Sequence, residues 1–512
     1  MTSDSGASRH RPSQPTLSAR QRWQVLAAVM LAFTPVVIDM TILHVAIPSL
    51  TLALDATSTE VLWIIDIYPL LMAGLLVPMG TLADRLGNRR VLLAGLAIFG
   101  VASLFAALAP NAHLLICARV LLALGGSMIM PSALGIIRRT FDDAQERATA
   151  LGIWGTVGAA GAAVGPLVGG ALLERYWWGS VFLINVPLMI LIIPVVWGRL
   201  PRREVLVPGN WNIGQALLLI VGMVSVVYSI KALLGTAVPA YLAIAVGLIG
   251  LSLLGGFALS QTRARRPMLD LSLFSEPAIC AGMLMALVVT GALAGVELTL
   301  AMELQYVLDR TPLEAGLFML PIMVAAAVGG PAAGVLSNRF GLRLVSSGSL
   351  AVSAGALAYL AYQGLDAPLL AAGALALLGL ALSIGLTASS IAILGAVDAS
   401  KGAAAGSLEA TAYELGTALG ITLFGAFMSS VFRRYLDAPG QLTGGVLEKA
   451  SRSIGDSLLA AQQLSPADGR ALVEAAKAAF LHTHSVLLGV CAGLLALLAL
   501  VIFRMLRRSS CP

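Results

Sequence analysis

The residues best placed to do chemistry are two charges inside apolar sequence, Asp39 and Arg119. Asp39 lies in an apolar run over residues 23–50. A charge near a bilayer centre costs on the order of 3 kcal/mol on insertion scales and usually faces a bundle interior or a water-filled path. Arg119 is the one basic residue that we place well inside an apolar run, and a buried guanidinium requires a partner, for which we expect Asp39. Direct proton coupling and a structural ion pair are both open for these two residues.

More carboxylates lie within apolar runs: Asp66, Glu297, Glu303, Glu409 and Glu414. A cation:proton exchanger needs such acids, which are neutral when protonated and anionic when they receive the substrate. Glu409 and Glu414 are about 140° apart around a helix, so they cannot share one narrow face. We favour Glu414 for substrate because it follows Tyr413, whose ring can bind a cation, whereas Glu409 serves packing or an inner vestibule. Glu303 is expected to be a solvated acid near the outer end.

Aromatic side chains that could line a cavity for flat organic cations are Trp63, Tyr68, Trp154 and Tyr413. Trp63 fits the aromatic belt at a membrane interface equally well. Asp66 lies one helical turn deeper than Trp63, which favours a paired role in substrate binding.

The chain that positions these residues is strongly apolar, with 58% hydrophobic residues, 11% charged residues and a mean hydropathy of +0.90. These values exclude an ordinary soluble protein and predict an all-α polytopic membrane protein. About fourteen apolar runs are long enough to cross a bilayer. Their approximate ranges are 23–50, 61–82, 90–109, 113–137, 148–173, 180–199, 213–233, 239–260, 277–306, 313–336, 343–362, 368–396, 404–432 and 485–506.

Basic residues gather in alternate short loops, which predicts that these loops and both termini are cytoplasmic. The opposite short loops offer little beyond Arg175, Lys231 and Arg310. Anionic lipid headgroups along the inner membrane face account for the net charge of +6. We therefore expect no nucleic-acid partner.

One short turn occurs twice: residues 80–90 read GTLADRLGNRR, and residues 334–343 read GVLSNRFGLR. The two copies predict two related six-helix halves with two inserted helices, and parallel repeats about an axis along the membrane normal are typical of major facilitator transporters. Under this repeat Glu297 is the rough counterpart of Asp39, and we expect the two acids to face each other across the cavity.

The expected organisation is a cytoplasmic leader over 1–22, a first half over 23–199, inserted helices with their loops over 200–276, a second half over 277–506 that includes an outer loop over 433–484, and a cytoplasmic tail over 507–512.

Two segments could control a gate. In the first copy of the turn, Asp84, Arg85 and Arg89 can bridge the ends of neighbouring helices as a latch, with a tight, membrane-anchored turn as the alternative. In the fifth run, small residues at 161, 165 and 169 share one helix face and permit close packing, while Pro166 adds a kink. We assign Gly161, Gly165 and Pro166 to gating, with a packing seam as the alternative.

These segments resemble the major facilitator superfamily. The turn at 80–90 is similar to its loop signature, with Asn88 in place of a basic residue, and Gly161–Gly170 looks like the antiporter motif that sets exporters apart from importers. With about fourteen spans, the chain resembles the fourteen-helix drug:proton antiporters over nearly its whole length. Resemblance to the methyl viologen and quaternary ammonium exporters rests on Leu62–Tyr68, Trp178–Pro187 and Ala412–Gly416.

The resemblance implies a proton-coupled multidrug efflux antiporter, not an enzyme, that exports organic cations such as methyl viologen, quaternary ammonium compounds and cationic dyes across the bacterial inner membrane. The proton gradient would be its energy source, with no cofactor and no metal. We expect a monomer whose partners are lipophilic organic cations, protons and membrane lipids. An exporter of another metabolite or antibiotic, a transporter of lipid or peptide-like substrates and a membrane sensor are the alternatives.

In this interpretation each candidate residue has a role. Proton coupling falls to Asp39, Arg119 and Glu297. Substrate binding falls to Asp66, Glu414, Glu409, Tyr413, Trp63 and Tyr68.

The outer loop contains Ser465-Pro466-Ala467-Asp468, an N-cap followed by a first-turn proline and an acid, and then apolar residues at helical spacing. We expect a short helix or hairpin over the outer opening. A gating role is one hypothesis, and a plain ordered linker is the other.

Overall fold

The computed structural model describes residues 18–202, 204, 212–234, 238–264, 267–365, 367–397, 402–437 and 444–508. Residues 1–17 of the expected leader and 509–512 of the expected tail lie outside the described residues. Every regular element in the described ranges is a helix. Fourteen helical segments in these ranges are long and apolar enough to cross a membrane, so the expected polytopic all-α fold is confirmed.

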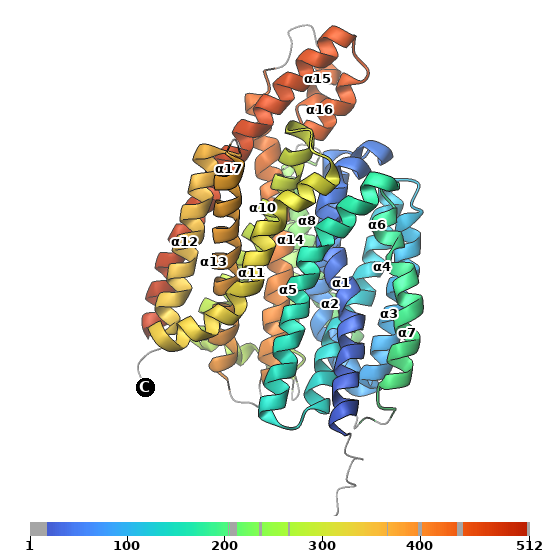
Figure 1. The fold of residues 1–512 in the computed structure, drawn as a ribbon, viewed down its shortest axis with the longest axis vertical. Helices are drawn as coiled ribbons and strands as arrows, with labels where there is room; N and C mark the ends of the chain where they lie inside the picture. The colour runs from blue at the N-terminus through green and yellow to red at the C-terminus, as the bar shows by residue number, and fades with distance from the viewer. Residues whose placement is uncertain are drawn as a thin grey trace, which may run out of the picture.

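The first six spans form one packed bundle around a shared apolar core (Figure 1). Their helices are α1 (Ala19–Leu54), α2 (Ser58–Leu86), α3 (Asn88–Ala107), α4 (Ala112–Thr140), α5 (Ala144–Arg175) and the consecutive pair α6 (Ser180–Leu183) and α7 (Asn185–Arg199). Local chemistry sets where these helices begin: Ser18 and Thr57 each form a capping box at the start of α1 and α2.

The last six spans pack around a second apolar core. Their helices are α10 (Pro277–Met302), which continues into the π-helix η2 (Glu303–Val307), then α11 (Pro312–Phe340), α12 (Leu342–Gln363), α13 (Pro368–Gly395), α14 (Gly402–Tyr435) and α17 (Pro466–Arg508). The short helices α15 (Gly444–Ala450) and α16 (Ile454–Ala461) lie between α14 and α17.

Two further spans, α8 (Ile213–Leu234) and α9 (Ala240–Arg263), lie between the two bundles in the chain and are followed by the 3₁₀ helix η1 (Leu271–Ser275). Helix α8 packs on α9 and also touches α2 and α14. Through α8, the inserted pair therefore contacts both bundles.

The repeated turn has the same backbone in both copies. Gly87 joins α2 to α3 with φ of 98°, and Gly341 joins α11 to α12 with φ of 82°. Because side chains disfavour this positive-φ region, glycine is needed at both positions. The sequence repeat is thus also a structural repeat.

The two ends of the bundle differ. We call the end where α2 leads into α3 the basic end, and the end that carries α15 and α16 the loop end; Figure 1 shows the loop end at the top. The predicted cap at Ser465 is confirmed, because its hydroxyl accepts a hydrogen bond from the Asp468 amide at 3.2 Å. The helix that it starts is not a separate short one: α17 runs unbroken from the loop end through the last span, since nothing between Pro466 and Arg508 breaks the helix.

Candidate functional site

The predicted Asp39–Arg119 pair is present in the first bundle. Asp39 Oδ2 lies 2.6 Å from Arg119 Nη1, and the side chains are 0% and 2% exposed. Arg119 Nε also donates to the Ile64 carbonyl at 3.1 Å, and its guanidinium lies 4.4 Å from the Tyr68 ring centroid. Three helices, α1, α2 and α4, therefore meet at this guanidinium. It contacts a carboxylate, a carbonyl and an aromatic ring.

Glu414 on α14 is buried without a basic partner. Its residue is 3% exposed, and its Oε2 atom accepts no hydrogen bond from the described residues. No ion pair found within the described ranges includes it, although charge interactions from both Asp39 and Glu414 reach Tyr68. Tyr68 is therefore within electrostatic range of both the Asp39 pair of one bundle and Glu414 of the other. A buried carboxylate without a cation is expensive unless it is protonated or receives one.

Asp66 on α2 lies in a different setting. Its Oδ2 atom is 2.7 Å from Lys231 Nζ on α8 and accepts from the Thr422 hydroxyl on α14 at 2.6 Å. The Lys231 ammonium also lies 3.9 Å from the centroid of the Trp63 ring. Trp63 and Asp66 contact one group, and that group is a lysine of the protein.

Lys231 was missed as a site residue. Its position in the sequence groups Lys231 with the short loops opposite the basic ones, yet Lys231 lies in the last turn of α8 with a side chain only 9% exposed. Apolar residues on both sides of Lys231 were the available signal. The Lys231 side chain is buried, although it lies at a helix end, because it pairs with Asp66 on α2.

Glu297 on α10 faces α1, but its partner is not Asp39. Its Oε2 atom lies 3.5 Å from His44 Nδ1, and both side chains are nearly buried. His44 lies on α1 beyond Asp39 toward the loop end, so the expected contact is displaced along the helix. The result is a buried pair between the two bundles.

Glu303 is 5% exposed and pairs with His484 on α17, so the expectation of a solvated acid is wrong. Its burial follows from the long α17, which covers this side of α10.

Glu409 accepts hydrogen bonds from the hydroxyls of Ser390 on α13 and of Tyr413, the latter at 2.5 Å. The Tyr413 hydroxyl therefore donates to Glu409 and not to Glu414, so the position of Tyr413 next to Glu414 in the sequence no longer favours Glu414 as the substrate acid. The Glu414 carboxylate still has no basic partner among the described residues.

The residues assigned to a latch lie at the basic end. Asp84 Oδ1 is 2.9 Å from Arg139 Nη2 on α4, and Arg85 is exposed in the last turn of α2. Arg89 donates to the Trp197 carbonyl on α7 at 2.8 Å. These contacts all join helices of the first bundle, so in this conformation they brace that bundle.

Helix α5 packs closely against α1 on one side and against α11 on the other. A Cβ on Gly161 would lie 3.1 Å from Val37 Cβ, and one on Gly165 would lie 3.1 Å from the Ile38 carbonyl, both on α1. On the other side, a Cβ on Gly316 of α11 would lie 2.7 Å from the Pro166 carbonyl. The predicted close packing of span five is confirmed, and α5 also holds the two bundles together.

This close packing lies in the loop-end half of α5. Thr311, just before α11, donates to Glu174 at 3.1 Å, whereas a Cβ on Gly152 or Gly155 near the other end of α5 would meet nothing within 4 Å. Gln305 likewise donates to the Val45 carbonyl at 3.1 Å. The bundles are closed against each other at the loop end.

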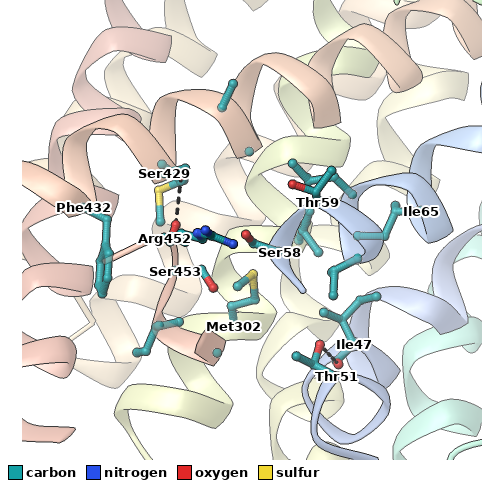
Figure 2. Close-up of a pocket in the computed structure, with 18 of the residues that line it drawn as sticks. Ile47, Thr51, Ser58, Thr59, Ile65, Met302, Ser429, Phe432, Arg452 and Ser453 are labelled. Carbon is teal, nitrogen blue, oxygen red and sulfur yellow. Dashed lines mark hydrogen bonds between the residues drawn. The ribbon is translucent and has the colours of Figure 1, made fainter. Parts of the chain in front are cut away.

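A cavity lies at the loop end. It holds about 160 Å³ and is bordered by α1, α2, α8, α10, η2, α14, α17 and residues 452–455 before and in α16. Figure 2 shows Arg452 reaching into it beside Ser58, while Ser429 donates to the Arg452 carbonyl at 2.8 Å. Pockets for drug-sized ligands usually hold about 300–1,000 Å³, so this one would have to widen to pass such a molecule.

Trp154 does not join the cluster around Tyr68. Its ring stacks on Phe33 of α1 with centroids 5.0 Å apart, and its Nε1 atom has no hydrogen-bond partner within the described ranges. It lies in the part of α5 nearer the basic end.

Comparison with known proteins identifies the family. The family model of the Major Facilitator Superfamily matches residues 29–421. The chain is 44% identical over 480 residues to the methyl viologen resistance protein SmvA of Salmonella typhimurium, covering 94% of this chain and 97% of that protein. It is 36% identical to the multidrug efflux pump LfrA of Mycolicibacterium smegmatis, with 91% and 92% covered.

The fold comparison agrees. A bacterial homolog of the human lysosomal transporter Spinster, solved in an inward-facing and unoccupied conformation, matches with a TM-score of 0.68 at 18% identity, covering 96% of this chain and 99% of that chain. At this identity the likeness concerns the fold alone. Taken with the family match and the relatives, the chain is a multi-pass membrane transport protein, not an enzyme, and belongs to the major facilitator superfamily.

Proposed function

We propose that this protein is a proton-coupled multidrug efflux antiporter that exports organic cations such as methyl viologen, quaternary ammonium compounds and cationic dyes. The observation that carries the proposal is Glu414, a buried carboxylate without a basic partner among the described residues. An intramembrane acid normally marks a substrate or proton path. The relatives named for methyl viologen resistance and multidrug efflux support the same substrate class.

The proposed mechanism is alternating access by the two bundles, which correspond to residues 23–199 and 277–506. Organic cations bind Glu414 and Asp66 from the basic end, which we place in the cytoplasm together with both termini of a monomer in the bacterial inner membrane. Opening of the loop end exposes Glu414 to outside protons, which neutralise it and release the cation. Deprotonation toward the cytoplasm then restores cation affinity.

Proton coupling is proposed for the Asp39–Arg119 pair and for Glu297. Protonation of Asp39 would remove its attraction for Arg119 and free that guanidinium to move over the Tyr68 ring, which is also within electrostatic range of Glu414. Protonation at the His44–Glu297 pair would act on the contact between α1 and α10. The first event links a proton to the substrate site, and the second links a proton to the loop-end closure.

The test uses purified protein in proteoliposomes, with movement of methyl viologen and of tetraphenylphosphonium driven by a pH gradient. Wild type should move both cations, and Asp39→Asn should move neither while still inserting. Asp55→Asn is the matched control, because Asp55 is an exposed acid just after the same helix, with a φ of 46° that asparagine also tolerates. Wild-type transport by Asp39→Asn would contradict the role of Asp39. Absence of movement by folded wild type would contradict the cation assignment.

A second candidate substrate class is an antibiotic. The tetracenomycin C resistance and export protein of Streptomyces glaucescens is 31% identical over 421 residues, covering 80% of this chain and 76% of that protein. Export of tetracenomycin C without movement of either cation in the same proteoliposomes would favour this class.

A further inference from the structure

Lys231 sits where an organic ammonium would be expected to bind. Its Nζ atom is 2.7 Å from the Asp66 carboxylate, 3.9 Å from the Trp63 ring centroid and 3.3 Å from the Leu62 carbonyl. A carboxylate, an aromatic face and a carbonyl are the groups that recognise ammonium ligands in low-dielectric sites. In this structure the protein's own side chain fills that position.

Three parts of the chain build the position. Asp66 and Trp63 come from α2 of the first bundle, Lys231 comes from the inserted helix α8, and Thr422 on α14 of the second bundle donates to Asp66 at 2.6 Å. Relative motion of the bundles would therefore change the contacts of Asp66. A site at such a junction can respond to the transport cycle.

Lys231 can leave Asp66 without unfolding its helix. It lies in the last turn of α8, and a flexible four-carbon stem at a helix end can carry its ammonium toward the interface. It also borders the cavity of about 160 Å³ that Leu62 and Thr422 help to line. Arg119 offers the contrast, because it lies well inside α4 and is held by Asp39, the Ile64 carbonyl and the Tyr68 ring.

We propose that Lys231 is a tethered ligand of the site formed by Asp66, Trp63 and Thr422, which a transported organic cation displaces and which returns when that cation leaves. The inference rests on the proposed cation export. It assigns the inserted helix α8 a direct part in substrate binding. It also means that Asp66 exchanges one cation for another and needs no proton of its own.

A tethered ammonium makes the site selective. A ligand on a short flexible tether competes at an effective concentration of about millimolar. Small inorganic cations, which gain little from the Trp63 face or the apolar cavity, would not displace it. Lipophilic aromatic cations gain both contacts and would.

The first test measures binding of tetraphenylphosphonium to the purified full-length protein by calorimetry. Lys231→Met keeps the apolar stem and removes the competitor, so affinity should rise about tenfold or more, whereas Lys231→Arg should show no such gain. Lys449→Met on α15 removes a lysine outside the site and should bind like wild type. Asp66→Asn should bind more weakly than wild type. Unchanged or weaker binding by folded Lys231→Met would overturn the proposal and leave Lys231 as a structural tether.

The second test needs no variant. The chain has four lysines, Lys231, Lys401, Lys449 and Lys477. Acetylation of the wild type by a water-soluble ester, read by mass spectrometry, should increase several-fold at Lys231 when tetraphenylphosphonium is added, relative to Lys449 and Lys477 in the same sample. Unchanged or decreased acetylation at Lys231 would overturn the displacement.

Cation export and the tethered ligand are separated by these results. If wild type binds the cation and Asp66→Asn weakens that binding, but neither Lys231 readout responds, cation export stands and the tethered ligand is rejected. If folded wild type binds neither tetraphenylphosphonium nor methyl viologen, both proposals fail together.

Discussion

Replacing Asp39 and replacing Arg119 should lower the free energy of unfolding by different amounts. Arg119→Gln leaves the buried Asp39 carboxylate without a cation, and its other side-chain partner, Asn185, is neutral. Asp39→Asn leaves a guanidinium that keeps the Ile64 carbonyl and the Tyr68 ring. The arginine variant should therefore be the less stable one.

The magnitude follows from the separation and burial of the charges. The atoms in contact are 2.6 Å apart. With charge centres about 4 Å apart and an effective dielectric constant of about 20, the attraction is about 4 kcal/mol. Breaking a buried pair at one side typically costs about 3–5 kcal/mol, so we expect that loss for Arg119→Gln and a smaller one for Asp39→Asn. The double variant replaces the ions by two amides that can bond each other and should recover most of the loss.

The assay is a double-mutant cycle on the free energy of unfolding, measured by sodium dodecyl sulfate titration, together with ethidium efflux. The double variant should fold but not transport, because it has no proton to exchange at this position. Losses that simply add in the double variant would refute the energetic coupling. Efflux by the double variant at the wild-type rate would refute the role of the pair in proton coupling.

Other predictions concern the loop-end closure, the substrate acid and the outer loop. Gly170→Leu should disfavour the closed loop end by about 1–3 kcal/mol, since a Cβ at this position would lie 2.6 Å from the backbone of α11. Cysteine labelling of the loop end should therefore increase. Gly155→Leu, at an open position on α5, is the control. Glu414→Gln should weaken cation binding by about 1.5–3 kcal/mol in calorimetry, and an equal loss in exposed Glu448→Gln would contradict a specific role. Burial raises the pKa of Asp456 on α16, so the folded loop holds this proton more tightly than the unfolded chain and loses stability as pH rises through that pKa. Asp456→Asn should flatten this pH dependence in hydrogen exchange of α16, and an unchanged slope would assign it to another group.

Several features could be derived from the sequence because their causes are local or periodic. Span length follows from bilayer thickness, so the fourteen apolar runs could be counted in advance. The matching turns at Gly87 and Gly341 were visible as repeated letters because both need the same positive φ. The Asp39–Arg119 pair was predictable because an unpaired buried guanidinium is too costly to keep.

The partners of the other acids depended on tertiary structure. Nothing local distinguishes Glu303, held by His484 on the long α17, from Glu414, which has no basic partner among the described residues. Lys231 reads as a helix-end residue until α8 is placed against α2, where Asp66 turns it inward. Such pairings join residues far apart in the chain, and their energies depend on distance and burial, which only the packed helices determine.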